Sequence, residues 1–346
     1  MKHSIKRFAV TVLLVSITCG CNDLSFEYGN DIKFNASTGR LTRADYSGDI
    51  VGSVERIDWE SGDKIRIACN QVSEPSSKYA DYLLESISSD GRYSSAKIGV
   101  STEDNAVGLR WGIGDHNFYA VYPSPLMSGV TRSLDNNIAS GEIPASQSVE
   151  SYSGTAAAKV AKPDFDASMM MVSSKTVNVK SNSRDVSLDF IPVTTAIQFT
   201  ITNKTGEALS TCKVELSSNS HPLSGPFTCD IATGESTFTG TLSGCKTVNI
   251  TFAEPIVTPI DGTLTFTFFL NPADDLDDLS LLVYEQSNKN RFTELKKADN
   301  SPVVFSSGVK AIVSGIFVPA GAVWKVAQKS NVYTWTDGTA KDVGLE

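Results

Sequence analysis

The sequence predicts an all-β protein of two tandem antiparallel β-sandwich domains. Three observations lead to this fold class. Short stretches alternate apolar with polar residues, which is the pattern of a strand with one buried face. Clusters of Gly, Asp, Asn and Ser separate these stretches, as turns do. Ser and Thr, 44 and 29 of the 346 residues, occupy many outward positions of the strands, where Thr in particular is favoured.

The predicted strands place their apolar residues two positions apart. They are Lys64–Cys69, Val186–Ile191, Ala196–Thr202, Cys212–Leu216, Thr247–Phe252, Leu264–Leu270 and Leu279–Glu285. In the fourth of these, the pattern puts Cys212, Val214 and Leu216 on the buried face. Turn clusters lie at Glu60–Asp63, Ser89–Gly91, Asn203–Gly206 and Ile260–Gly262. The segment Ser76–Leu84 fits either a helix or a strand, and the prediction of an all-β fold does not depend on it.

The length of the chain favours two folding units, because single cores stop growing at about 250–300 residues. The polar stretch Lys180–Asp185 separates apolar Met169–Val172 from the strand that follows, so we place the domain boundary there. The expected organisation is a signal peptide (1–20), an N-terminal segment (21–43), two sandwich domains (44–184 and 185–319) and a C-terminal tail (320–346).

The N-terminus has the features of a secretory signal peptide. Met1–Arg7 carries the positive charges, and Phe8–Ile17 is an apolar stretch of ten residues. This stretch is shorter than the roughly 20 residues of a membrane-spanning helix, so we predict no such helix. The small residues that lead to Cys21 resemble the lipobox of bacterial lipoproteins, which predicts lipidation of Cys21. The alternative is an ordinary signal peptide with a chance cysteine.

Charge argues against nucleic acid as a partner. Removal of the leader leaves 27 Lys and Arg against 39 Asp and Glu, a net charge of −12. Binding to a phosphate backbone requires clustered basic residues.

Groups for catalysis are scarce. Only His116 and His221 follow the leader, and the chain has no phosphate-binding loop, zinc-protease motif or nucleophile elbow. We therefore expect a protein that is not an enzyme, with no catalytic residue, cofactor or metal. The cluster Asp274–Asp278 could bind calcium, but it lacks the spacing of an EF-hand loop. A solvated acidic loop is the simpler interpretation.

Four cysteines remain beyond the leader: Cys69, Cys212, Cys229 and Cys245. An exported protein can form disulfides, and an even number is compatible with two bridges. Cys69 and Cys212 occupy apolar strand positions, where a free thiol behaves as a small hydrophobe. If one bridge forms, the candidate pair is Cys229 with Cys245.

Ordered fragments along nearly the whole chain are similar to one family. They are Ile32–Ala36, Thr42–Ala44, Trp59–Ile65, Phe118–Pro123, Ile143–Gln147, Asp166–Met170, Leu188–Phe190 leading into Ala196–Ile201, and Leu223–Phe227. In this order they resemble the fimbrillins, pilus subunits of anaerobic Gram-negative bacteria that are exported as lipoproteins. The resemblance implies transthyretin-like sandwich domains, an outer-membrane lipid anchor, a fimbrial location and a role in cell adhesion.

The family's assembly route implies sites in this chain. An arginine-specific protease cuts after Arg40 or Arg43 and releases the strand Ile32–Ala36, and another subunit's terminal segment fills the groove by donor-strand exchange. The donor would be the segment from Val323 to Ala327 or the segment from Val332 to Trp335. The alternatives are that both arginines are ordinary surface residues and that the tail is an ordinary final strand.

The expected partners are other subunits, in a homo- or heteropolymer, the outer membrane and a host or bacterial surface receptor. The tail beyond Pro319 slightly favours a shaft or accessory subunit over a tip subunit. The alternative function is a lipid-anchored binding module that does not polymerise. Such a module would capture a protein, or a glycan through exposed aromatic residues such as Trp59, Trp111, Tyr119 and Tyr122.

Overall fold

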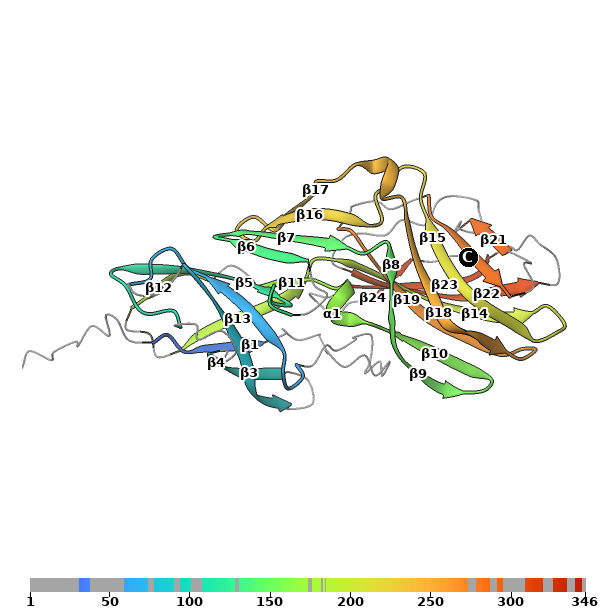
Figure 1. Ribbon diagram of the computed structural model, residues 1–346, viewed down its shortest axis with the longest axis horizontal. Helices are drawn as coiled ribbons and strands as arrows, with labels where there is room; N and C mark the ends of the chain where they lie inside the picture. Colours follow the sequence, from blue (N-terminus) through green and yellow to red (C-terminus); the bar gives the residue numbers. More distant parts are fainter. Residues whose placement is uncertain are drawn as a thin grey trace, which may run out of the picture.

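The chain forms an elongated molecule of two lobes, one after the other along its long axis (Figure 1). The computed structural model describes residues 31–37, 59–73, 78–89, 94–100, 108–127, 131–173, 176–181, 183, 185–272, 278–286, 291–294, 309–319, 326–334 and 340–343. Nearly all of its regular elements are strands, so the all-β prediction is confirmed.

The first lobe is an eight-stranded sheet in the order β11-β13-β1-β4-β3-β2-β5-β12. Its strands are β1 (Phe34–Ser37), β2 (Lys64–Ala68), β3 (Tyr79–Ser89), β4 (Ser94–Val100), β5 (Asp115–Tyr122), β11 (Met171–Ser173), β12 (Thr176–Lys180) and β13 (Val186–Pro192). Strand β11 pairs with both β13 and β5, so the sheet closes on itself around its core.

The second lobe contains two facing sheets. The seven-stranded sheet, in the order β24-β23-β22-β14-β19-β10-β9, is built from β9 (Val149–Thr155), β10 (Ala158–Pro163), β14 (Thr195–Lys204), β19 (Thr263–Leu270), β22 (Val309–Pro319), β23 (Val326–Thr334) and β24 (Ala340–Val343). The five-stranded sheet, in the order β21-β20-β15-β18-β8, is built from β8 (Ser146–Gln147), β15 (Leu209–Ser217), β18 (Thr247–Thr258), β20 (Ser280–Glu285) and β21 (Arg291–Glu294). Buried Phe199 and Phe266 of one sheet belong to the same apolar core as Val214 and Ile250 of the other.

A third, four-stranded sheet lies along the top of the molecule in Figure 1, in the order β17-β16-β7-β6. Its strands are β6 (Arg132–Asp135), β7 (Ile138–Ile143), β16 (Gly225–Asp230) and β17 (Glu235–Phe238). A second apolar cluster joins its Ile143 and Phe227 to Tyr119 and Val121 of β5. This sheet therefore covers the outer face of the first lobe.

Strands from both sides of the predicted boundary at residues 184 and 185 meet in the same sheets. Strand β13, which follows the boundary, pairs with β1 in the first lobe. Strands β8, β9 and β10, which precede it, belong to the second lobe. The division into domains at this point stays a prediction.

The structure corrects one local prediction and decides another that the sequence left open. Cys212 is only half-buried, whereas Thr211 is buried, because a β-bulge between Thr211 and Lys213 shifts the alternation by one residue. The strand interpretation of Ser76–Leu84 is correct from Tyr79 onward, since these residues begin β3.

All four described cysteines are free thiols, so the suggested Cys229–Cys245 bridge is wrong. The Sγ atom of Cys245 lies beside Gly225, at 2.5 Å from where a Cβ atom would stand. Cys229 is four residues further along β16, which is about 13 Å in a strand. Disulfides join Cα atoms that are less than about 7 Å apart.

The described helices are short. The single turn α1 (Phe165–Ser168) begins at Asp164, whose carboxylate accepts a hydrogen bond of 3.2 Å from the Ala167 amide. The 3-10 turn η3 (Leu242–Gly244) joins β17 to β18. Within the described part of the chain, no helix has the length and apolar character that crossing a bilayer requires.

Candidate functional site

Strand β1 is an interior strand of the first lobe, although it is the N-terminal element of the described chain. It pairs in parallel with β13, Phe34 opposite Val186, and antiparallel with β4, Asn35 opposite Lys97. The backbone also bonds before the strand begins: the Ile32 amide donates to the Leu109 carbonyl at 2.9 Å. Both edges of β1 are therefore saturated by neighbouring strands.

One face of this segment is fully buried. Ile32, Phe34 and Ala36 are 4%, 1% and 0% exposed, as the alternating pattern predicts. The ring of Phe34 meets those of Tyr82 and Phe118 edge-to-face, with centroids 5.1 and 5.3 Å apart. Burial of a large apolar side chain stabilises a fold by about 1.5–3 kcal/mol. The segment thus fills an apolar slot between β13 and β4.

Polar contacts at the ends of the segment are exposed. Asp31 accepts a hydrogen bond from Arg110 at 3.1 Å, and the Ser37 hydroxyl donates to Asp189. Exposed ion pairs of this kind contribute about 0–1 kcal/mol. Apolar burial and backbone pairing, rather than charge, therefore hold β1 in place.

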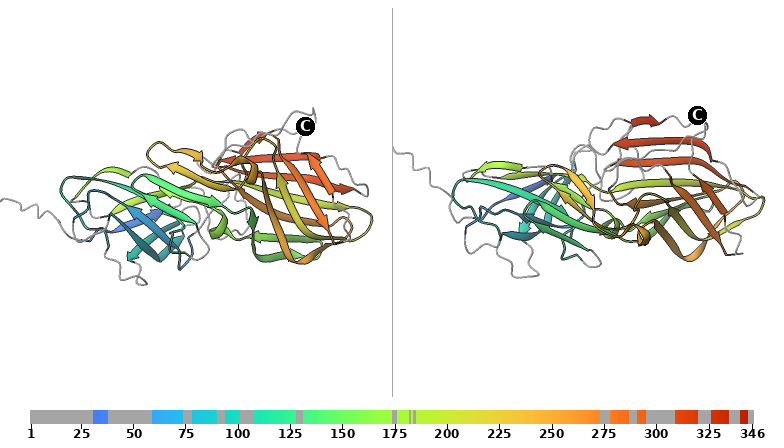
Figure 2. Two further views of the ribbon diagram at one scale, coloured as in Figure 1. Left: turned by 45° about the horizontal axis from the view of Figure 1, so that its top comes forward. Right: turned by 90° about the horizontal axis from the view of Figure 1, so that it is seen from above.

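The C-terminal strands form the outer edge of the seven-stranded sheet. Strand β22 lies parallel to β14, β23 returns antiparallel along β22, and β24 pairs with β23. These strands appear in red and orange at the rim of the second lobe in Figure 2. Removal of β23 and β24 would leave the remaining strands of the sheet paired with one another.

The predicted site residues fall partly within the described chain. Ala327 and Val332 lie in β23, whereas Cys21, Arg40, Arg43, Val323 and Trp335 lie outside the described residues. Within one molecule β1 and β23 belong to different sheets. The structure therefore does not bring the predicted removable strand and the predicted donor together in one chain.

The four aromatic residues expected to bind a glycan in the alternative function do not form an exposed platform, because they are buried. Trp59, Trp111, Tyr119 and Tyr122 are 2%, 1%, 7% and 1% exposed. A sugar-stacking platform requires an exposed ring face, and these rings instead fill the apolar interior, where Trp59 packs edge-to-face on Tyr122 at 5.1 Å. They offer no stacking surface to a glycan.

No pattern in the sequence predicts the carboxylate pair that buried Asp63 and half-buried Asp166 form. The hydroxyl of Tyr122 lies between Asp63, at 3.0 Å, and Asp166. Burial raises the pKa of Asp63 to about 7, and burial also raises the pKa of Asp166. The hydroxyl carries one proton, so it can donate to only one of the two carboxyl groups at a time. This pair joins the turn before β2 to helix α1.

These acids belong to a pocket that is also lined by Glu60, Glu150, Asp164 and Lys162. No three metal-ligating side chains of the described residues are grouped so that they could hold an ion. Both Asp63 and Asp166 lie in fragments that we singled out for the family resemblance. That resemblance was the only signal in the sequence, because the two residues are far apart along the chain.

Asp278, the described member of the acidic cluster Asp274–Asp278, braces a turn. Its carboxylate accepts from the Asn219 amide at 2.7 Å and from the Ser220 amide and hydroxyl at 2.8 and 2.9 Å. The Ser218 hydroxyl also donates to it. Partial burial opposes ionisation, but these hydrogen bonds outweigh it and lower the pKa of Asp278. Residues 274–277 lie outside the described part.

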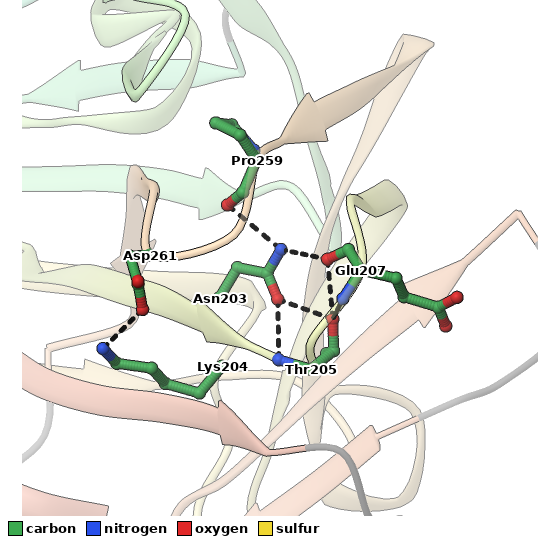
Figure 3. A network of polar contacts seen from close by, with 6 residues as sticks. All are labelled: Asn203, Lys204, Thr205, Glu207, Pro259 and Asp261. Atoms are coloured by element: carbon green, nitrogen blue, oxygen red, sulfur yellow. Dashed lines mark hydrogen bonds and ion pairs between the residues drawn. The ribbon is translucent and has the colours of Figure 1, made fainter.

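At the outer end of the second lobe, buried Asn203 ties two turns together (Figure 3). Its amide donates to the carbonyls of Glu207, Thr258 and Pro259 at 2.7, 2.9 and 3.1 Å. Its oxygen accepts from the amide and hydroxyl of Thr205 at 2.9 and 2.7 Å. The turns that follow β14 and β18 are therefore held in one arrangement.

Comparison with known proteins matches this architecture. The model of the fimbrillin-like family matches residues 42–335, most of the chain. The chain belongs to the fimbrillin-like family. Among solved structures, a proposed cell adhesion protein from Bacteroides uniformis is 17% identical with a TM-score of 0.56, covering 89% of this chain and 98% of its own. A similar protein from Bacteroides ovatus is 16% identical with a TM-score of 0.55, covering 89% and 99%. At these identities the likeness concerns the fold. No curated protein matches the chain.

Proposed function

We propose that this fimbrillin is a structural subunit of a fimbria that serves cell adhesion. It is exported as a lipoprotein anchored through Cys21 to the outer membrane, and an arginine-specific protease cuts after Arg40 or Arg43. The cut releases β1, and a C-terminal segment of another subunit takes its place by donor-strand exchange. Family membership supports the fimbrial role. The role is structural, and no step of it requires a cofactor or an active site.

The placement of β1 is the observation that carries the assembly route. The strand lies between β13 and β4, so its loss would expose two rows of backbone hydrogen-bonding groups and an apolar slot. An open slot of this kind is a site for β-augmentation, in which an added strand supplies backbone hydrogen bonds and its alternate side chains fill the apolar positions. A subunit without β1 therefore has a strong drive to accept a donor.

The C-terminal strands are the most available donor. Strands β23 and β24 are attached to the seven-stranded sheet through β22 alone. Their departure would break the pairing of β22 with β23 and leave the other pairings of this sheet in place. Both candidate segments, from Val323 to Ala327 and from Val332 to Trp335, overlap or adjoin β23. Departure of β23 would make either segment available to a second copy.

The test begins with a soluble Cys21→Ala precursor treated briefly with an arginine-specific protease, while mass and oligomer size are followed together. The proposal expects loss of the segment that ends at Arg40 or Arg43, followed by a ladder of multimers. A matched control carries Arg40→Lys and Arg43→Lys, which removes the cleavage sites but keeps the charge. The control should stay monomeric. Clean loss of the segment with a persistent monomer would contradict donor-strand assembly.

A further inference from the structure

Two turns at opposite ends of the molecule expose large apolar side chains. Ile113 is 85% exposed, and Val257 and Ile260 are 56% and 53% exposed. We refer to these segments as the 111–115 turn and the 257–262 turn. Isolated surface hydrophobics are common, but these three are the most exposed large apolar side chains of the described residues, and they lie at the two ends of an elongated subunit. This placement suggests end-to-end contact.

The strand pairings place each turn at an outer end of the molecule. The 111–115 turn leads into β5, whose beginning pairs with β12 at the far left of Figure 1 and whose end pairs with β11 nearer the middle. The 257–262 turn ends β18, whose beginning pairs with β8 in the middle of the molecule. The two turns therefore lie at the two poles of the long axis.

The 111–115 turn is held rigidly by a buried histidine. The Gly112 amide donates to Nε2 of His116 at 3.0 Å, and Nδ1 of His116 donates to the Gly114 carbonyl at 3.0 Å. His116 is fully buried, with its ring edge-to-face on Trp111 at 4.9 Å. Gly112 cannot carry a side chain, because a Cβ atom would stand 2.0 Å from the Gln71 carbonyl oxygen. Ile113 is thus presented outward by a fixed backbone.

The 257–262 turn is held in a corresponding way by Asn203 (Figure 3). The side-chain amide of Asn203 donates to the carbonyls of Thr258 and Pro259, and its backbone carbonyl accepts from the Asp261 amide at 2.9 Å. Lys204 pairs with the Asp261 carboxylate at 2.6 Å. Exposed Ile260 therefore stands on a braced turn beside one exposed ion pair.

One pole lies beside the slot that β1 fills, and the other lies where the proposed donor segment begins. The 111–115 turn adjoins the entrance of the β1 slot, since Leu109 and Arg110 bond to Ile32 and Asp31. At the other pole, Pro319 ends β22 opposite Lys204, and the chain returns along β22 as β23, which belongs to the proposed donor. A donor segment that runs from one copy into the slot of the next would bring the two poles together.

We propose that the 257–262 turn of one copy packs against the 111–115 turn of the next copy and forms a second contact beside the donated strand. This inference rests on the proposed function and names a surface that assembly uses. Ile113 meets Val257 and Ile260 in an apolar centre. The Lys180–Asp115 pair at one pole and the Lys204–Asp261 pair at the other supply charges of both signs for a polar rim.

Charge variants test the contact. Ile113→Glu and Ile260→Lys each place a charge against an apolar surface, so each should slow polymer growth of the processed Cys21→Ala chain about tenfold or more, measured by light scattering. The double variant places opposite charges face to face and should recover growth to within about threefold of the parent. Leu242→Glu is the matched control, because Leu242 is 38% exposed but lies on η3. It should leave growth unchanged.

A second readout separates this contact from strand exchange. A synthetic peptide of residues 320–346 should bind the processed parent and all variants equally, because the slot itself is intact. Normal peptide uptake together with parental growth of Ile113→Glu would overturn the contact. If the processed parent takes up no peptide, the proposed function fails. The contact between the 257–262 turn and the 111–115 turn is then tested by measuring self-association of the unprocessed chain in sedimentation. In that measurement Ile113→Glu must weaken self-association about tenfold. Self-association equal to that of the parent would overturn the proposed contact.

Discussion

The Phe34→Ala substitution tests how strongly β1 is held before processing. Phe34 is 1% exposed and lies against the rings of Tyr82 and Phe118. Truncation of a buried Phe to Ala costs about 3–5 kcal/mol, because apolar contact is lost and the cavity closes only in part. The slot has backbone strands on both sides, which resist collapse, so we expect a loss in the upper part of this range.

The assay is urea unfolding of the unprocessed Cys21→Ala chain with and without Phe34→Ala. The control is Asn35→Ala, because Asn35 is half-buried on the other face of the strand and its loss should cost less than about 1 kcal/mol. In the proposed assembly route, protease treatment removes Phe34 together with β1. Polymers grown from the variant should therefore unfold at the same urea concentration as polymers grown from the parent.

Two outcomes would refute this reasoning. A loss below about 1 kcal/mol in the unprocessed chain would mean that Phe34 does not fill the slot as the structure shows. An equal loss in the precursor and in the polymer would mean that Phe34 remains in the assembled fibre, so that β1 is never replaced.

Two further predictions concern stability. Burial raises the pKa of Asp63 from 3.8 to about 7, so the folded state binds the proton more tightly and the free energy of unfolding falls as pH rises from about 4 to 7. Asp63→Asn should reduce this fall by up to about 4 kcal/mol, as measured by urea unfolding across that pH range. An unchanged pH profile would contradict the prediction. Gly225 has φ +96° and a Cβ atom there would stand 2.5 Å from Sγ of Cys245, so Gly225→Ala should cost about 2–4 kcal/mol in thermal unfolding. Gly206→Ala, at φ +84° with open space around it, should cost only about 1 kcal/mol, and equal costs would show that the cysteine contact has no effect.

Alternation along the sequence predicted most of what is local in this fold. It placed the strand residues Phe199 and Ile250 on buried faces, where the structure has them. It failed at Cys212, because a β-bulge changes the phase and leaves no mark in the pattern of apolar residues. Period two reports which face of a strand is buried, but not where an extra residue is inserted.

Pairing partners could not be predicted in the same way. The buried face of Ile32, Phe34 and Ala36 follows from their spacing. The position of β1 between β13 and β4 instead depends on contacts far apart along the chain, 152 residues for Ser37 with Asp189 and 62 for Asn35 with Lys97. The pair Asp63 and Asp166 was missed for the same reason. A single sequence shows no distance between them, and each residue alone resembles an ordinary turn or helix acid.

Directional complementation tests the central claim most directly. An acceptor-only chain is processed to lose β1 and ends after Pro319, so that it has a slot but no donor. A donor-only chain carries Arg40→Lys and Arg43→Lys, so that it keeps β1 and its full tail. Strand exchange predicts that each chain alone stays monomeric and that the mixture forms a one-to-one complex that grows no further. A mixture that remains monomeric, or acceptor-only chains that polymerise by themselves, would contradict the account.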